Sequence, residues 1–201
     1  MAQDPAVTAA QVTDFWLSEC SPSDWYRGDP EFDAQCSARF GSALADLKAG
    51  LLQSWRSAPD TTLAYLLLAD QLSRNIHRGT AEAFASDALA RAAAKQAIAL
   101  DWDRRIAEPQ RQFFYMPLVH SEYLEDQDRA VRLFVQRMPE TGADNLLHAR
   151  AHREVIRKFG RFPARNVALG RKSSGAEMAY LESNGYSALL EALSGGPSEA
   201  V

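Results

Sequence analysis

The amino-acid sequence predicts an all-α protein, a compact multi-helical array of seven to nine helices. The first observation is composition: 34 Ala and 22 Leu stand against 8 Val and 4 Ile among 201 residues. Ala and Leu lead the helix scale, whereas strands are rich in β-branched residues. The second observation is that helix caps and helix breakers recur at short intervals. Short connections place successive helices antiparallel, as in a compact array or an α-solenoid.

Caps and breakers divide the first half of the chain. Asp29 is an N-cap followed by Pro30 at the first helical position, and Gly50 ends the helix that they open. We expect Asp60 to cap the next, strongly apolar helix, and Gly79 to separate it from an Ala-rich one. The helices expected here cover about residues 8–19, 30–50, 60–74 and 81–100.

Proline and glycine divide the second half in the same way. Pro109 opens a short segment, Pro117 interrupts the chain after it, and Pro139 ends a further helix. Gly160 begins an irregular stretch, and Ser174 opens a capping box with the glutamate three residues later. The helices expected here cover about residues 109–115, a segment ending near 138, 144–159 and 174–185.

The length favours a single helical domain over residues 1–201, with an ordered core over about 8–185 and a C-terminal tail over 186–201. A chain of this size buries roughly 70% of its surface on folding, so it requires no disulfide or metal. Cys20 and Cys36 are too few for a disulfide scaffold and lack the spacing of a zinc site, which favours a reducing compartment.

Charge and hydropathy exclude several classes of protein. The net charge of −4 opposes non-specific nucleic-acid binding, so we expect no nucleic-acid partner. The N-terminus has no signal-peptide pattern, and the longest apolar run, residues 63–69, is far shorter than the ~20 residues of a spanning helix. We expect a soluble, cytoplasmic protein with no membrane partner. The motifs of nucleophile elbows, phosphate loops, dinucleotide sites and zinc proteases do not occur in the sequence, and we predict no cofactor.

Asp70 occupies an unusual position in the apolar helix. It continues the face of Leu63, Leu66 and Leu67, so its carboxylate is predicted to point inward. A buried carboxylate needs a cation or several donors, and Arg74 at i+4 is the natural partner. Two interpretations remain open: a structural ion pair between helices, or a carboxylate that aims Arg74 into a pocket.

Basic residues concentrate in one stretch of the second half. Residues 150–172 hold eight of the 22 basic residues against Glu154 alone, whereas residues 1–50 hold eight acidic and three basic ones. The loop at 159–166 is rich in Phe, Gly and Pro, which predicts a rigid loop with buried aromatic anchors. Its arginines could fork onto a carboxylate or phosphate. They could equally cap helix carbonyls within the protein.

The histidines allow two interpretations. His148 and His152 lie at i and i+4, and His120 and Glu122 follow the Pro117 break. His120, Glu122 and His152 offer an N/N/O ligand set. The favoured interpretation is a hydrogen-bonded histidine of a core or pocket in each case, so we predict no metal.

Three ordered motifs resemble a bacterial family of unknown function, number 924 among such domains. They are LLADQLSRNIHRGT at residues 67–80, MPLVHSE at 116–122 and FGRFPARN at 159–166, the last followed by LGR at 169–171. The resemblance covers about residues 12–181 and implies an all-α fold similar to tetratricopeptide proteins, with no established activity. Ala164 stands where the family often has a histidine, which weakens a catalytic role for that loop. The family's polar motif positions fall on Asp70, Gln71, Arg74, Asn75, Arg78, His120, Glu122, His152, Arg161, Arg165, Asn166 and Arg171.

We hypothesise that these residues, Gln71 excepted, line a groove of a binding module for an anionic ligand: a peptide carboxylate, a phosphorylated metabolite or a nucleotide. The alternative is a small hydrolase or transferase in which His120 or His152 is the general base, Glu122 orients it and arginines stabilise negative charge. A third hypothesis is a purely structural or oligomer-forming protein in which each of these residues satisfies a helix end. The sequence leaves the oligomeric state open, a homodimer included.

Overall fold

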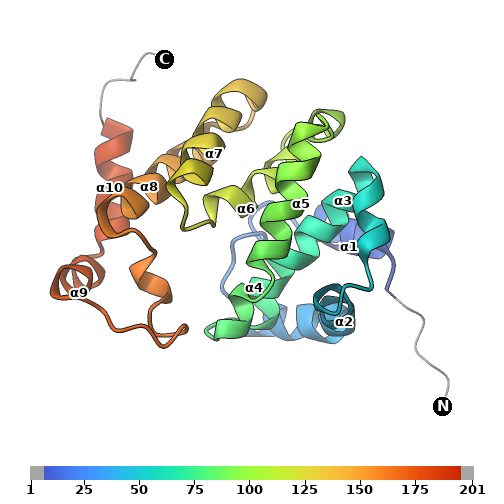
Figure 1. Ribbon diagram of the computed structural model, residues 1–201, viewed down its shortest axis with the longest axis horizontal. Helices are drawn as coiled ribbons and strands as arrows, with labels where there is room; N and C mark the ends of the chain where they lie inside the picture. The colour runs from blue at the N-terminus through green and yellow to red at the C-terminus, as the bar shows by residue number, and fades with distance from the viewer. Residues whose placement is uncertain (1–6, 196–201) are drawn as a thin grey trace. The chain divides into compact units, whose positions relative to one another are not determined.

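The computed structural model describes residues 7–195 and divides into two compact units, residues 1–117 and 118–201 (Figure 1). Every regular element over 7–195 is a helix, and no strand occurs among them. The all-α prediction is therefore confirmed. None of the helices described is both long and apolar enough to cross a membrane.

In unit 1 the helices begin with α1 (Ala9–Asp14), which continues into the π-helix η1 (Phe15–Glu19). Helix α2 begins as predicted, because the Asp29 side chain accepts a hydrogen bond from the backbone N–H of Glu31. The remaining elements are α2 (Pro30–Lys48), η2 (Gln53–Ser57), α3 (Pro59–Leu66), η3 (Leu67–Leu72), α4 (Ser73–Ile76), η4 (Ala81–Phe84), α5 (Asp87–Ala99), η5 (Asp103–Arg105) and η6 (Gln110–Phe114).

Two boundaries in unit 1 differ from the prediction. Asp60 lies in the first turn of α3, and the N-cap is Ala58, because Pro59 with its restricted φ starts the helix. The helix expected over 81–100 is two elements, the short 3₁₀-helix η4 and α5. Ser86 lies between them and donates to the carbonyl of Ala69 at 2.6 Å, which ties this junction to η3.

The core of unit 1 is aromatic. The ring of Phe15 stacks on Phe32 with centroids 5.9 Å apart and contacts Phe40 at 5.0 Å. The indole of Trp25 donates to the backbone carbonyl of Trp16 at 2.7 Å. These contacts join η1 to α2 and to Trp25. Helix α2 packs in turn against η3 and α4, the part of the helical run that carries Asp70.

Unit 2 begins within α6 (Met116–Val119) and contains α7 (Leu124–Arg137), α8 (Ala143–Phe159), the 3₁₀-helix η7 (Pro163–Arg165), α9 (Gly175–Glu182) and α10 (Gly185–Gly195). Gly160 ends α8 as predicted, in the left-handed conformation with φ of 69°. Ser174 and Glu177 form the predicted capping box of α9. Helices α7 and α8 pack side by side, and α10 packs on α8 (Figure 1).

The segment expected as a C-terminal tail is helical as far as Gly195, and residues 196–201 lie outside the described residues. The preceding helix, expected to end at Gly185, ends at Glu182 with Ser183 as its C-cap, and Gly185 instead begins α10. The reason is apolar burial: Tyr186 and Leu189 of α10 pack against the buried Val155 and Phe162. Helix α10 thereby forms one wall of the site described next.

Candidate functional site

The predicted site residues form two polar clusters, one in each unit. Unit 1 holds four of them: Asp70, Arg74, Asn75 and Arg78. Unit 2 holds the other seven: His120, Glu122, His152, Arg161, Arg165, Asn166 and Arg171.

Asp70 points inward, as its helical position predicted, and is 1% exposed. The Arg74 guanidinium lies 3.0 Å from Asp70 Oδ1 and 3.0 Å from Asp87 Oδ1, so it joins η3 to the start of α5. Gln71 donates to Asp70 Oδ2 at 2.6 Å. The Asp70–Arg74 pair predicted from the i, i+4 spacing is confirmed, and it connects two helices of unit 1.

Asp70 lies in a π-helix, η3, that the sequence pattern did not predict. A π-helix bonds i to i+5 and is found mostly as a short insertion in α-helices, frequently at functional sites. All six residues of η3 are buried. Its position allows Asp70 to face Arg74 while the apolar residues around it remain in the core.

Asn75 and Arg78 join α4 and its C-terminal turn to α2. Asn75 donates to Asp33 Oδ1 at 2.8 Å, and Arg78 contacts both Asp33 oxygens, at 2.5 and 2.9 Å. Arg78 also donates to the backbone carbonyl of Arg27. Burial alone would raise the pKa of Asp33, but the hydrogen bonds from Arg78 and Asn75 outweigh it and lower that pKa. These contacts are the structural ion pairs and caps of the third hypothesis.

In unit 2, Glu122 anchors the irregular loop after α8. Its carboxylate accepts from Arg171 in a bidentate pair at 2.8 and 3.0 Å, and from the backbone N–H of Phe162 at 2.8 Å. Burial raises the pKa of Glu122, but the hydrogen bonds from Arg171 and Phe162 outweigh it and hold that pKa below its usual value. Glu122, which the enzyme hypothesis expected to orient a histidine, therefore binds Arg171 and Phe162 of the loop instead.

Arg161 and Asn166 complete the internal network of this loop. Arg161 donates two hydrogen bonds to the carboxylate of Glu177, at 2.6 and 2.8 Å, and a third to the carbonyl of Lys172 at 2.9 Å. Asn166 accepts from Arg171 at 3.0 Å. Arg161 and Arg171 are thus paired within the protein, chiefly with the carboxylates of Glu177 and Glu122 rather than with the helix carbonyls of the second interpretation.

Arg165 differs from those two arginines because it lines a cavity. One of its Nη atoms donates to the backbone carbonyl of His120 at 2.8 Å, and its guanidinium lies 4.5 Å from the centroid of the Phe162 ring. These two contacts orient the guanidinium. Phe162 is itself 8% exposed, so it is the buried aromatic anchor that the loop composition predicted.

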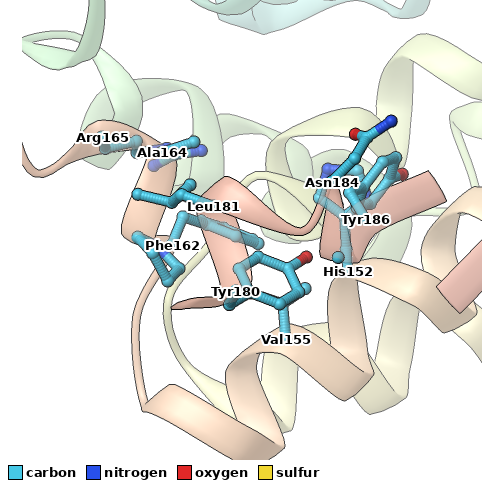
Figure 2. A pocket seen from close by; sticks show the side chains of 11 residues that line it. His152, Val155, Phe162, Ala164, Arg165, Tyr180, Leu181, Asn184 and Tyr186 are labelled. Carbon is cyan, nitrogen blue, oxygen red and sulfur yellow. The ribbon is translucent and has the colours of Figure 1, made fainter. Parts of the chain in front are cut away.

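The cavity has a volume of about 310 Å³ and lies between α8, the loop of η7, α9 and α10. Its lining is mostly apolar, and Arg165 carries the one formal charge among the lining residues that the structure describes. Figure 2 shows Arg165 and Ala164 at one end, and His152, Asn184 and Tyr186 at the other. The residues that line it are His152, Val155, Phe162, Pro163, Ala164, Arg165, Tyr180, Leu181, Asn184, Gly185 and Tyr186.

His152 is held by its Nδ1 atom. This atom lies 2.8 Å from the carbonyl oxygen of His148 and 3.0 Å from the hydroxyl of Tyr186. The same hydroxyl lies 2.8 Å from His148 Nδ1. Burial and the neighbouring His120 lower the pKa of His152 to about 3. His152 is therefore a neutral imidazole at physiological pH.

His120, His152 and Arg165 come together as one group. The rings of His120 and His152 have centroids 6.4 Å apart, and the carbonyl of His120 is the acceptor for Arg165. His120 belongs to the motif at 116–122 and Arg165 to the motif at 159–166, so this group brings two of the three family motifs together. Within residues 7–195 no three His, Cys, Asp or Glu side chains are grouped to hold a metal ion, so the N/N/O set does not assemble there.

A family model described as "Bacterial protein of unknown function (DUF924)" matches residues 12–185. The chain belongs to this family. Among solved structures it is similar to a protein of unknown function, ATU0120, from Agrobacterium tumefaciens, with a TM-score of 0.81 and 39% sequence identity. The match covers 87% of this chain and 97% of that one. No curated protein matches the chain.

Several cavity residues of this DUF924 chain were not predicted. Tyr186 bridges His148 and His152 from 38 and 34 residues away, and Tyr180, Leu181 and Asn184 form the α9 side of the wall. No motif marks them in the sequence. The one available signal was the apolar pattern that continues beyond Gly185, which indicates a further buried helix rather than a tail.

Proposed function

We propose that unit 2 is a binding module for a small monocarboxylate with an apolar body. The observation that supports this function is the cavity itself, where one guanidinium faces walls of Val155, Phe162, Tyr180 and Leu181. Ligand sites are commonly apolar cavities of about 300–1,000 Å³ with a few placed polar groups. The 310 Å³ of this cavity lies at the small end of that range.

The charge balance favours a carboxylate over a phosphate or nucleotide. Arg165 is the one charged residue of the lining described, and its charge also helps to lower the pKa of the nearby Glu122. Because His152 is neutral, this lining suits a ligand with no more than one negative charge. Arg161 and Arg171, which would be needed to neutralise a phosphate dianion, are paired with Glu177 and Glu122. A guanidinium fork also fits the geometry of a carboxylate.

The pKa of His152 supports binding over general-base catalysis. A general base works best when its pKa lies near the operating pH. With a pKa of about 3, His152 is a weak proton acceptor in catalysis, although its ring still accepts hydrogen bonds. Glu122, the residue assigned to orient such a base, is committed to Arg171 and to the backbone of Phe162.

The test is titration of the protein with 3-phenylpropionate, monitored by NMR chemical shifts and by calorimetry. The uncharged 3-phenylpropan-1-ol is the control ligand. We expect the acid to bind and to perturb resonances of Phe162 and Tyr180. Arg165→Gln should weaken it by about 10- to 100-fold, since a hydrogen bond to a charged group contributes about 1.5–3 kcal/mol. Arg165→Lys should retain part of the affinity because the charge remains.

The control variant is Arg132→Gln on the exposed side of α7, which should bind as the parent does. Circular dichroism and melting temperature establish that each variant is folded. If the alcohol binds as tightly as the acid, or if the folded Arg165→Gln variant keeps full affinity, the cavity is not a carboxylate site. Absence of binding by the parent protein rejects the proposed function itself.

A further inference from the structure

We propose that a second copy of this chain covers a groove between α8, α9 and α10, so that unit 2 forms a symmetric dimer through α10. This interface is independent of the proposed carboxylate site, since it lies at a second groove. Three features of the C-terminal helices support it: their low burial, the groove beside them and two unmatched charges.

The first feature is the low burial of α9 and α10. Among the residues that the structure describes, no residue of α10 is buried, and Glu177 is the one buried residue of α9. Helix α7 of the same unit has six buried residues. The sequence of α10, GYSALLEALSG, nevertheless carries apolar residues around most of the helix. A helix with this pattern is normally covered on more than one side.

The second feature is the groove itself, which has a volume of about 790 Å³. Its α9 and α10 sides consist largely of small residues, Ala176, Ala179, Gly185 and Ala188. The distance between two packed helices depends on the side chains at their contact, so a further helix can approach this surface closely. Tyr180 and Gly185 line both the groove and the candidate cavity, which makes the two hollows neighbours.

The exposed face of α10 fits this groove. It includes Ala188, Glu191 and Ala192, which lie at helical spacing on the side of α10 that is open to solvent. Ala188 also lines the groove. In a two-fold dimer the same surface patch of each copy meets that of the other. The small face of each α10 therefore packs along the groove of the other copy.

The third feature is the charge at the rim of the groove, where α8 contributes Glu154, Arg157 and Lys158. Arg157 donates to Glu154 at 2.8 Å and lies 3.6 Å from Asp128, so its charge is compensated within the chain. The Lys158 ammonium forms no ion pair with the residues over 7–195. Lys158 is thus the cation left for a partner at this rim.

Glu191 supplies the complementary charge. It is exposed on α10 and, within the described part of the chain, has no cationic partner. The Lys158 ammonium lies 5.2 and 5.9 Å from the ring centroids of Phe159 and Tyr180, and these cation–π contacts hold it beside the groove. In a two-fold dimer Lys158 of each copy meets Glu191 of the other, so the ion pair forms twice. Complementary charges of this kind select a partner and its register, which favours a second copy as the occupant.

The experiment is sedimentation velocity of the whole chain at protein concentrations from about 1 μM to about 1 mM. We expect a species with twice the chain mass of 22.2 kDa, whose population rises with concentration. Lys158→Glu and Glu191→Lys each bring like charges together twice, and each should raise the dissociation constant of the dimer by about 10- to 100-fold. The double variant Lys158→Glu/Glu191→Lys restores opposite charges and should dimerise nearly as the parent does.

Arg132→Glu, a charge reversal at an exposed position of α7, is the matched control and should leave the dimer unchanged. Circular dichroism establishes that each variant is folded. If the parent stays a monomer at every concentration, the proposal is wrong, and a different protein becomes the candidate occupant of the groove. If a dimer forms but neither single reversal weakens it, or the double variant fails to restore it, the copies associate through another face and the proposal is also wrong.

Discussion

Nδ1 of His152 lies 2.8 Å from the carbonyl oxygen of His148, four residues earlier in α8. The contact fixes both the hydrogen position and the orientation of the ring. It depends on a neutral imidazole at a half-buried position, and the stability of the protein is therefore linked to pH.

We predict that stability falls as the pH drops from 6.5 towards 4.5. In the unfolded chain the pKa of His152 is near the ordinary histidine value of 6.5, whereas in the folded protein it is about 3. Between these values the unfolded state binds a proton that the folded state does not, so the free energy of unfolding is highest above 6.5 and falls with the pH. The slope contributed by His152 reaches at most about 1.4 kcal/mol per pH unit.

Urea unfolding at pH 7, 6 and 5 measures this slope. The lowered pKa values of Glu122 and Glu177 affect stability below the ordinary glutamate value of 4.5, so the window above it excludes these two groups and includes His152. His152→Asn should flatten the slope and His77→Asn should keep it. An equal slope in both variants would show that another group titrates.

We predict that Asp70→Asn destabilises the protein by about 2–4 kcal/mol. Removing one charge of a buried pair leaves its partner poorly compensated, and Arg74 would then keep its ion pair with Asp87 but lose the one with Asp70. Asp101→Asn is the matched control, because Asp101 and Arg104 are 61% and 60% exposed and 3.8 Å apart. That change should shift stability by less than about 0.5 kcal/mol. If urea unfolding showed equal losses of stability for Asp70→Asn and Asp101→Asn, the Asp70–Arg74 pair would contribute no more than a surface ion pair.

Glu122→Gln should loosen the loop at 160–172. The variant loses the charge that Arg171 grips with two hydrogen bonds, which we expect to cost about 1–3 kcal/mol. Hydrogen exchange of the loop amides, Phe162 first, measures the effect. Glu191→Gln, an exposed position of α10, should leave the exchange rates unchanged. Unaltered protection in Glu122→Gln would mean that other contacts order the loop.

Gly185→Ala should disturb the cavity through Tyr180. A Cβ at position 185 would lie 2.2 Å from Cδ2 of Tyr180 and 2.9 Å from its carbonyl oxygen, so the chain must shift. We expect a lower melting temperature and weaker binding of 3-phenylpropionate. At Gly160 a Cβ meets no described atom within 4 Å, and Gly160→Ala should cost only about 1 kcal/mol of left-handed strain. The Gly160→Ala variant should bind 3-phenylpropionate as the parent does. If both variants lost affinity equally, the effect of Gly185→Ala could not be assigned to Tyr180.

Local patterns in the sequence predicted local structure. The Asp29 cap, the Ser174 capping box and the Asp70–Arg74 pair each span a few residues, so spacing and helix geometry suffice to find them. The candidate site depends on distant partners. Glu122 meets Arg171 across 49 residues of chain, a distance over which no periodicity carries information.

The same limit explains the arginines. Residue counting could identify a basic loop but could not assign a partner to each guanidinium. Arg161 and Arg171 are paired with the carboxylates of Glu177 and Glu122, and Arg165, which donates to the backbone carbonyl of His120, also lines the cavity. The similarity of unit 1 or unit 2 to tetratricopeptide arrays stays a prediction.

The π-helix η3 makes the number of residues before Arg74 as important as their identity. Each residue of an α-helix turns the chain by roughly 100°. Deleting one residue from η3, for example Ala69, would restore a regular α-helix and rotate everything after it by about that angle. Arg74 would then face away from Asp87, although every charged side chain would still be present. A single-codon deletion would thus reorient a helix face without altering the polar composition of the protein.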